Sequence, residues 1–155
     1  MLASVPSSAS PARQLFAQIT AQLEARYGQN GREMELGHWA FEVMTGGQRS
    51  QVIHLLFREL ATEGQDVSRV VVTSPVGPVP PRPDYETLLR WNAELDVGAI
   101  SITDLRTSEG VVPFYTVRAT HLVRTADFEE VWEMAEKVAR VADALEKEIY
   151  ATDTF

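Results

Sequence analysis

The sequence of 155 residues contains no cysteine. Disulfide bonds, thiolate zinc sites, iron–sulfur clusters and cysteine nucleophiles are therefore excluded. The sequence also lacks any apolar run approaching the ~20 residues that a membrane-spanning helix needs. Residues 1–9 carry no basic group ahead of an apolar run, which is unlike a secretory signal. We therefore expect a cytoplasmic protein without a membrane partner, in which 1–9 form a flexible lead-in to a single domain at 10–155.

Positive charge is scarce, because 14 lysines and arginines stand against 22 aspartates and glutamates and the formal net charge is -8. The electric field of this net negative charge repels the phosphate backbones of nucleic acids, so we expect no direct binding of nucleic acid. Hydrophobic residues make up 45% of the chain and charged residues 23%, which is ordinary globular composition. A chain of this length buries one sizeable core without covalent staples.

Three helices are expected, with N-caps at Ser10, Asp84 and Thr125. The first ends at Gly28 as a left-handed C-cap, and the second ends near Leu95. The last helix has apolar residues at alternating spacings of three and four, which form an apolar stripe along one side of the helix. Further apolar side chains beside this stripe make it wider than the seam of a coiled coil. The width favours packing in the core of the same chain over an intermolecular coiled coil.

Strands are expected wherever apolar residues alternate between glycine-containing turns. The run at 51–60 is compatible with a strand or a helix by periodicity, and its position beside a hairpin turn at 45–47 favours a strand. The expected strands are 39–43, 51–60, 67–73, 98–105 and 111–123. The order α-β-β-β-α-β-β-α predicts a two-layer α+β fold, in which helices pack on one face of an antiparallel sheet.

The segment at 75–83 is rich in proline and is expected to be an extended polyproline II loop, because proline disfavours helices and central strands. It contains PxxP matches at Pro78–Pro81 and Pro80–Pro83. Two interpretations remain open: a ligand for an aromatic-lined groove, or a stiff connector across the end of the sheet. The shortness of such motifs favours the connector.

The order of elements, together with the segments Leu88–Leu95, Phe114–Ala119 and Asp127–Trp132, resembles the YbjN family. The resemblance covers Pro11–Ile149. It implies a fold like that of the type III secretion chaperones, a small α+β domain that is commonly dimeric and holds other proteins. It also implies a non-enzymatic regulatory or chaperone-like role, often in stress responses, and it supplies no catalytic residue.

No catalytic, cofactor or metal site is predicted from the residues. His38, His54 and His121 lie in or beside strands without the spacing of a metal motif, so ordinary strand side chains are favoured. The acidic pairs at 129–130 and 146–148 occupy helix positions that point in different directions, which favours a solvated helix surface over acid–base chemistry. There is neither a Walker loop nor a GxSxG turn, so we expect no enzyme.

The strand at 51–60 is apolar on both of its faces, although a sheet with helices on one side normally shows water a polar second face. Another segment of the same chain covering that face is one explanation, and a homodimer or client surface is the one we favour. Because alternate residues of a strand point to the same face, the residues predicted to contact the partner are Val52, His54, Leu56 and Val71. Trp91 in the middle helix is predicted to be an aromatic anchor near the dimer contact.

The sequence therefore predicts a homodimeric chaperone-like or adaptor protein that holds a client segment by strand addition or in an apolar groove. Its net negative charge is expected to favour basic or neutral clients. The alternative is a regulatory domain that senses a small molecule in the cleft between the middle helix and the sheet.

Overall fold

The computed structural model describes residues 10–27, 31–108 and 110–150, so the expected lead-in at 1–9 and the expected C-cap at Gly28 lie outside the described residues. Its helices are α1 (Pro11–Tyr27), α2 (Tyr85–Glu94) and α3 (Phe128–Tyr150), and a 3₁₀ turn, η2 (Val123–Thr125), precedes α3. The strands are β1 (Gly31–Glu35), β2 (His38–Gly46), β3 (Arg49–Arg58), β4 (Ala61–Thr62), β5 (Gln65–Asp66), β6 (Arg69–Pro78), β7 (Ala99–Thr107) and β8 (Gly110–Leu122).

Six strands form one antiparallel sheet in the order β1-β2-β3-β6-β8-β7, and β4 and β5 form a small separate hairpin. The α+β class predicted from the sequence is confirmed, as is the hairpin turn between β2 and β3. The strands β1, β4 and β5 are additional to the predicted five. Charged residues dominate β1, and β4 and β5 have two residues each, so none of the three shows an apolar alternation.

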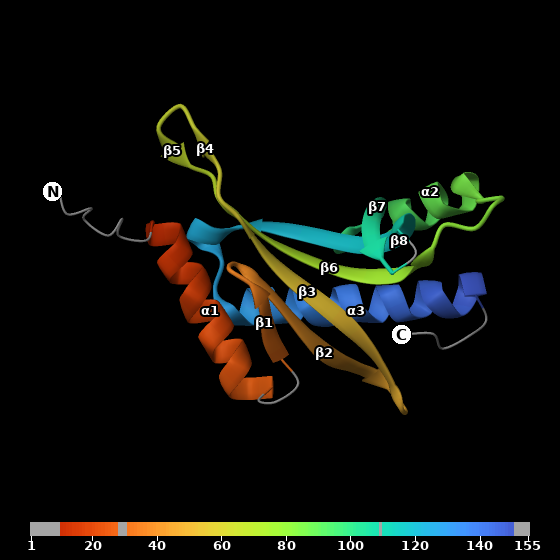
Figure 1. Cartoon of the computed structure of the whole chain (residues 1–155), viewed down its shortest axis with the longest axis horizontal. Coiled ribbons are helices and arrows are strands. Elements are labelled where there is room, and N and C mark those ends of the chain that lie inside the picture. Colours follow the sequence, from red (N-terminus) through yellow and green to blue (C-terminus); the bar gives the residue numbers. More distant parts are fainter. Residues whose placement is uncertain (1–9, 28–30, 109, 151–155) are drawn as a thin grey trace, which may run out of the picture.

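The core lies between one face of the sheet and the helices α1 and α3 (Figure 1). Ile53 and Leu55 of β3 point to this side and are 0% exposed. The stripe of α3 packs on the same side, with Val131, Ala135 and Val138 all buried. Core packing of α3 within its own chain, rather than in an intermolecular coil, is therefore confirmed.

The helix N-termini are capped by side chains that accept hydrogen bonds from backbone N–H groups. Ser10 accepts one at 3.3 Å at the start of α1, and Asp84 accepts one at 3.0 Å at the start of α2, as predicted. The prediction of Thr125 as the cap of α3 is wrong, because Thr125 lies in the 3₁₀ turn that precedes the helix. Asp127 is the cap, since it accepts from the N–H of Glu130 at 2.8 Å while the Glu130 carboxylate accepts from the N–H of Asp127 at 3.2 Å, a reciprocal capping box.

Residues Pro75–Pro78 belong to β6, so the prediction that the proline-rich segment avoids a central strand is wrong for this part. The pairing of β6 with β3 ends at Thr73, and from Ser74 onward β6 is paired with β8 alone. This stretch of β6 is a local edge, where a proline without an N–H interrupts no ladder. Residues 79–83 connect β6 to the Asp84 cap, and the choice between ligand motif and connector is left open by this geometry.

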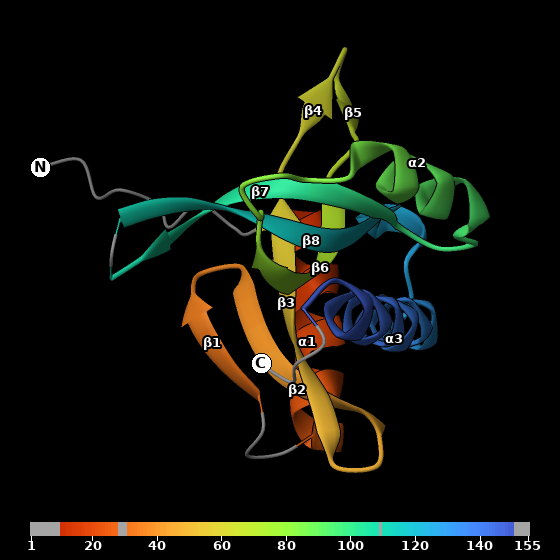
Figure 2. The same cartoon turned by 90° about the vertical axis from the view of Figure 1, so that its right-hand side faces the viewer.

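The sheet is strongly curved, and its β1–β2 and β7–β8 ends both project to the side away from α3 (Figure 2). The middle helix covers the β7 edge, where the side-chain amide of Asn92 donates to the carbonyl of Ile100 at 3.1 Å and accepts from its N–H at 2.6 Å. All three helices thus leave the opposite side of the sheet uncovered. None of the described helices is both long and apolar enough to cross a membrane.

Candidate binding surface

The uncovered side of the sheet is its concave face, and its side chains alternate along each strand with those of the core. We call the following side chains the concave face: His38, Ala40, Val52, His54, Leu56, Val71, Thr73, Pro75, Ser101, Thr103, Leu105 and Thr116. Apolar and small polar groups predominate among these central side chains, and charged side chains of the same strands lie around them. The face is therefore semi-apolar, as the parity of the strand at 51–60 predicts.

The predicted contact residues all lie on the concave face, with unequal access to solvent. Val52 is 36% exposed, and His54 and Leu56 are half-buried. Val71, opposite Leu56 in the register, is only 1% exposed and forms part of the floor. Val71 therefore offers little surface for direct contact, because a central position in a curved sheet is shielded by its neighbours, and its role in partner contact stays a prediction.

A hollow of about 180 Å³ lies at the centre of the concave face. His38, His54 and Leu56 line it from β2 and β3, and Thr103 and Leu105 line it from β7. In a flat sheet β3 and β7 would lie about 14 Å apart, with β6 and β8 between them. Curvature brings them around one hollow, so this half-barrel encloses an extended segment better than a flat surface does.

Two histidines meet in this hollow. Nε2 of His38 lies 2.9 Å from Nδ1 of His54, and Nδ1 of His38 lies 3.9 Å from Oε1 of Glu35. Burial, and to a smaller extent the charge of His38, lowers the pKa of His54 below its ordinary value. The contact follows from the hairpin register, in which Ala40 is opposite His54 and Leu56 opposite His38. The histidines were predicted as ordinary strand side chains, and this pairing was missed.

We expect the lowered pKa of His54 to make stability depend on pH. Between the lowered value and the ordinary value of about 6.5, the unfolded chain binds more protons than the folded chain, so acid favours unfolding. The contribution of neutral His54 to the free energy of unfolding is fully present above about pH 6.5 and is lost on acidification. The free energy changes by at most about 1.4 kcal/mol per pH unit for one proton. Urea unfolding at several pH values checks this. His54→Gln should flatten the slope, and an unchanged slope would contradict the assignment.

No family model matches the chain, and the comparison with curated proteins finds no match to it. The resemblance to the YbjN family stays a prediction. The case for function therefore rests on the geometry of the surface.

A second hollow, of about 480 Å³, lies between α2 and α3. Trp91, Leu95, Val141 and Leu145 provide its apolar walls, and charged side chains of both helices form its rim. Trp91 is half-buried and packs against the core, on the side of the sheet opposite to the concave face. The predicted dimer anchor and the predicted partner face are thus two different surfaces.

A buried polar cluster links β3, β6 and α3 beneath the core face of the sheet. Glu146 is 0% exposed, accepts from the Gln51 side-chain amide at 2.7 Å and lies 3.6 Å from the Arg49 guanidinium. Ser74 donates to Gln51 at 3.0 Å, and Asp143 accepts from Arg49 at 2.7 Å. The prediction that residues 146–148 are solvated is wrong for Glu146. Gln51, Ser74 and Glu146 are fully buried and have a structural role, whereas Arg49 and Asp143 at the outer end of the cluster are partly exposed.

The remaining polar groups do not converge on a reaction centre in the part of the chain that the structure describes. His121 lies 2.9 Å from the Leu122 carbonyl oxygen and 3.8 Å from a Glu130 oxygen, on the other side of the sheet from the His38–His54 pair. Within the described residues, no group of three or more histidine, aspartate or glutamate side chains is arranged to hold a metal ion. The concave face is thus the best-defined candidate surface.

Proposed function

We propose that this chain is a non-enzymatic chaperone-like or adaptor protein that holds a segment of a client protein on the concave face. The observation that carries the proposal is an uncovered, semi-apolar and strongly curved sheet face. Monomeric proteins rarely leave such faces unused, and clefts lined by apolar side chains bind apolar groups of a partner.

The edge at β1 supports a second component of client binding. β1 pairs with β2 alone, so the backbone groups on its outer side are open to another strand. An extended client segment can pair with such an edge through its main chain and place alternate side chains toward the concave face. Main-chain pairing supplies affinity, and the hollow between β3 and β7 supplies selectivity.

The surface around α2 supports a homodimer. Leu89 is 68% exposed, and Tyr85 and Ile102 are also exposed, around a smaller hollow of about 140 Å³ between α2 and β7. Trp91 of the same helix lines the hollow toward α3. We assign this apolar surface to contact with a second copy of the chain, in a cytoplasmic protein that acts in regulation or stress. The predicted role of Trp91 as an anchor belongs to this contact.

Client binding is tested by comparing the wild type with Val52→Asp plus Leu56→Asp in affinity purification from the native cells, with chemical crosslinking. We expect the wild type to recover one partner at near-stoichiometric level and the double variant to lose it, because two carboxylates cannot be desolvated against an apolar client segment. Val111→Asp, at an exposed position on the opposite side of the β7–β8 hairpin, is the matched control and should keep the partner. Retention by a folded double variant would contradict the assigned face.

The alternative function is the sensing of a small molecule, which is predicted from the sequence to occur in the cleft between the middle helix and the sheet. That cleft has a volume of about 140 Å³, and the larger hollow between α2 and α3 suits a ligand better. Its volume of about 480 Å³ falls within the range of ligand pockets. A ligand present at about 100 times its Kd stabilises the folded state by about 2.7 kcal/mol. A thermal-shift screen of common metabolites and nucleotides therefore distinguishes this function from client binding.

A further inference from the structure

Charge is distributed unevenly between the two sides of the sheet. The helix α3, on the core side, carries seven acidic and three basic residues. The strand register places four arginines on the concave side, Arg32, Arg58, Arg69 and Arg118, and two glutamates, Glu35 and Glu42. A protein with a net charge of -8 thus has a surplus of positive charge around its uncovered face.

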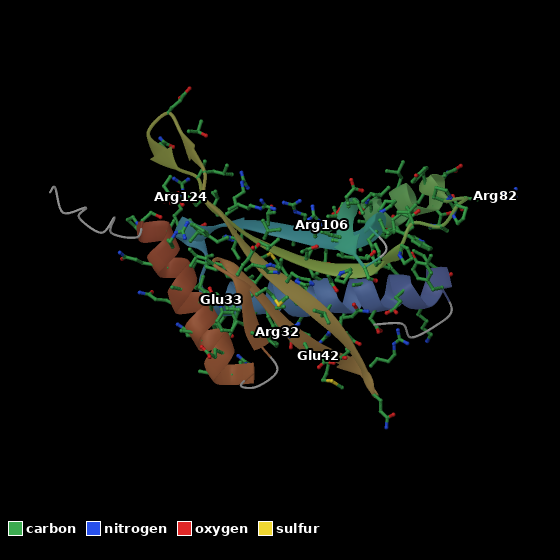
Figure 3. All side chains as sticks on the ribbon, in the orientation of Figure 1. Arg32, Glu33, Glu42, Arg82, Arg106 and Arg124 are labelled. Atoms are coloured by element: carbon green, nitrogen blue, oxygen red, sulfur yellow. The ribbon has the colours of Figure 1, made fainter. Side chains whose placement is uncertain are left out.

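The two glutamates lie against partners on their own hairpins. Glu35 lies 3.9 Å from His38, and Glu42 accepts a hydrogen bond from Ser50. Figure 3 shows Arg32 and Glu42 along β1 and β2, with Arg124 near the base of the β4–β5 hairpin, away from Glu42. Both glutamates are thus engaged by neighbours on β2 and β3.

Arg58 and Arg69 lie directly opposite each other on β3 and β6, and both are exposed. Like charges in directly opposite positions destabilise a sheet. The nearest acidic groups along the chain are engaged elsewhere, because Glu59 accepts from Arg13 at 2.9 Å and Asp66 accepts from the N–H of Ser68 at 2.9 Å. Within the part of the chain that the structure describes, neither arginine has an ion pair. Their juxtaposition is a cost to the free protein that an anionic partner would relieve.

The other two arginines stand on either side of the hollow. One row of the register runs from Arg32 on β1 through Ala40, His54 and Thr73 to Arg118 on β8. Both arginines are exposed. An apolar floor is thus bordered by a cation on each side and by the Arg58–Arg69 pair at one end.

We infer that the segment held on the concave face carries aspartate or glutamate beside its apolar side chains. This inference rests on the proposed function and names the chemistry of the client. Complementary charge across an interface raises the association rate and selects the partner. The local arrangement replaces the expectation of basic or neutral clients, which was drawn from the net charge of the whole chain.

The test uses two synthetic peptides with the same alternating leucine and valine pattern, one with glutamate and the other with lysine at the intervening positions. Binding to the full chain is measured by fluorescence anisotropy at low and high salt. We expect the glutamate peptide to bind about tenfold more tightly at low salt and the difference to shrink as salt screens the charges. Equal binding, or tighter binding of the lysine peptide, would overturn the inference.

The variant Arg58→Gln plus Arg69→Gln distinguishes a binding role from a structural one. It should reduce affinity for the glutamate peptide severalfold and leave the melting temperature unchanged or higher, because the like-charge contact is removed. Arg90→Gln, at an exposed position on α2, is the control and should keep the affinity. A double variant with unchanged affinity would overturn the assignment of these arginines.

The outcomes separate this inference from the proposed function. If both peptides bind equally and Val52→Asp plus Leu56→Asp abolishes both, the concave face binds clients without selecting acidic ones, and only this inference fails. If neither peptide binds, the proposed function fails with it. If neither peptide binds and sedimentation shows that the same double variant dissociates a dimer, the occupant is a second copy of the chain.

Discussion

Replacing Glu146 with alanine is expected to lower the free energy of unfolding by about 3 kcal/mol. The carboxylate is 0% exposed and accepts from Gln51 at 2.7 Å. Its removal leaves the Gln51 amide and the Arg49 guanidinium without this acceptor in the interior, where an unsatisfied polar group carries its full desolvation cost. Urea unfolding followed by circular dichroism measures the change.

Two control variants separate burial from charge. Glu148→Ala, two positions further along α3 and exposed, is expected to change stability by less than about 0.5 kcal/mol. Glu146→Gln keeps an oxygen acceptor for Gln51 while it removes the ion pair with Arg49, so its cost should be intermediate. Equal effects of Glu146→Ala and Glu148→Ala would show that the cluster contributes nothing to stability.

Replacing Leu55 with alanine is expected to cost about 3 kcal/mol, and replacing Leu56 with alanine less than about 1.5 kcal/mol. These neighbours on β3 point to opposite faces of the sheet. Leu55 is 0% exposed in the core, whereas Leu56 is half-buried in the hollow of the concave face. The same truncation leaves a closed cavity at one position and an enlarged open hollow at the other.

The ranking of this pair also tests which face is available to a client. Equilibrium unfolding measures stability, and binding of the client or of the glutamate peptide is measured in parallel. We expect Leu55→Ala to reduce stability with little effect on binding by the folded protein, and Leu56→Ala to reduce binding more than stability. The opposite ranking would show that the two faces have been exchanged.

The sequence predicts the fold class because its strongest patterns are local. The alternation of Val52 to Phe57 and the stripe of α3 each determine which side of an element is buried. Thr125 is wrongly predicted as the cap of α3 in place of Asp127, because a 3₁₀ turn before α3 moves the helix start by a few residues. Such turns have no apolar periodicity and leave little signal in a single sequence.

The features of the site that the sequence leaves undetermined depend on residues far apart in the chain. The burial of Glu146 requires Gln51, which is 95 positions away, so the pattern of α3 alone shows only one more acidic residue near its end. The His38–His54 contact requires the register of the β2–β3 hairpin, and the arginine arrangement requires the order of all six strands. The low exposure of Val71 follows from sheet curvature, which parity does not reveal.

Site-specific photocrosslinking tests the central claim most directly. A photoreactive amino acid replaces Val52 on the concave face in one variant and Val111, on the opposite side of the β7–β8 hairpin, in another. Both are illuminated in the native cells, and mass spectrometry identifies the crosslinked peptides. We expect one partner to be crosslinked from position 52 through an acidic, apolar segment, with little product from position 111. Equal yields from the two positions, or no product beyond the chain itself from position 52, would contradict the central claim.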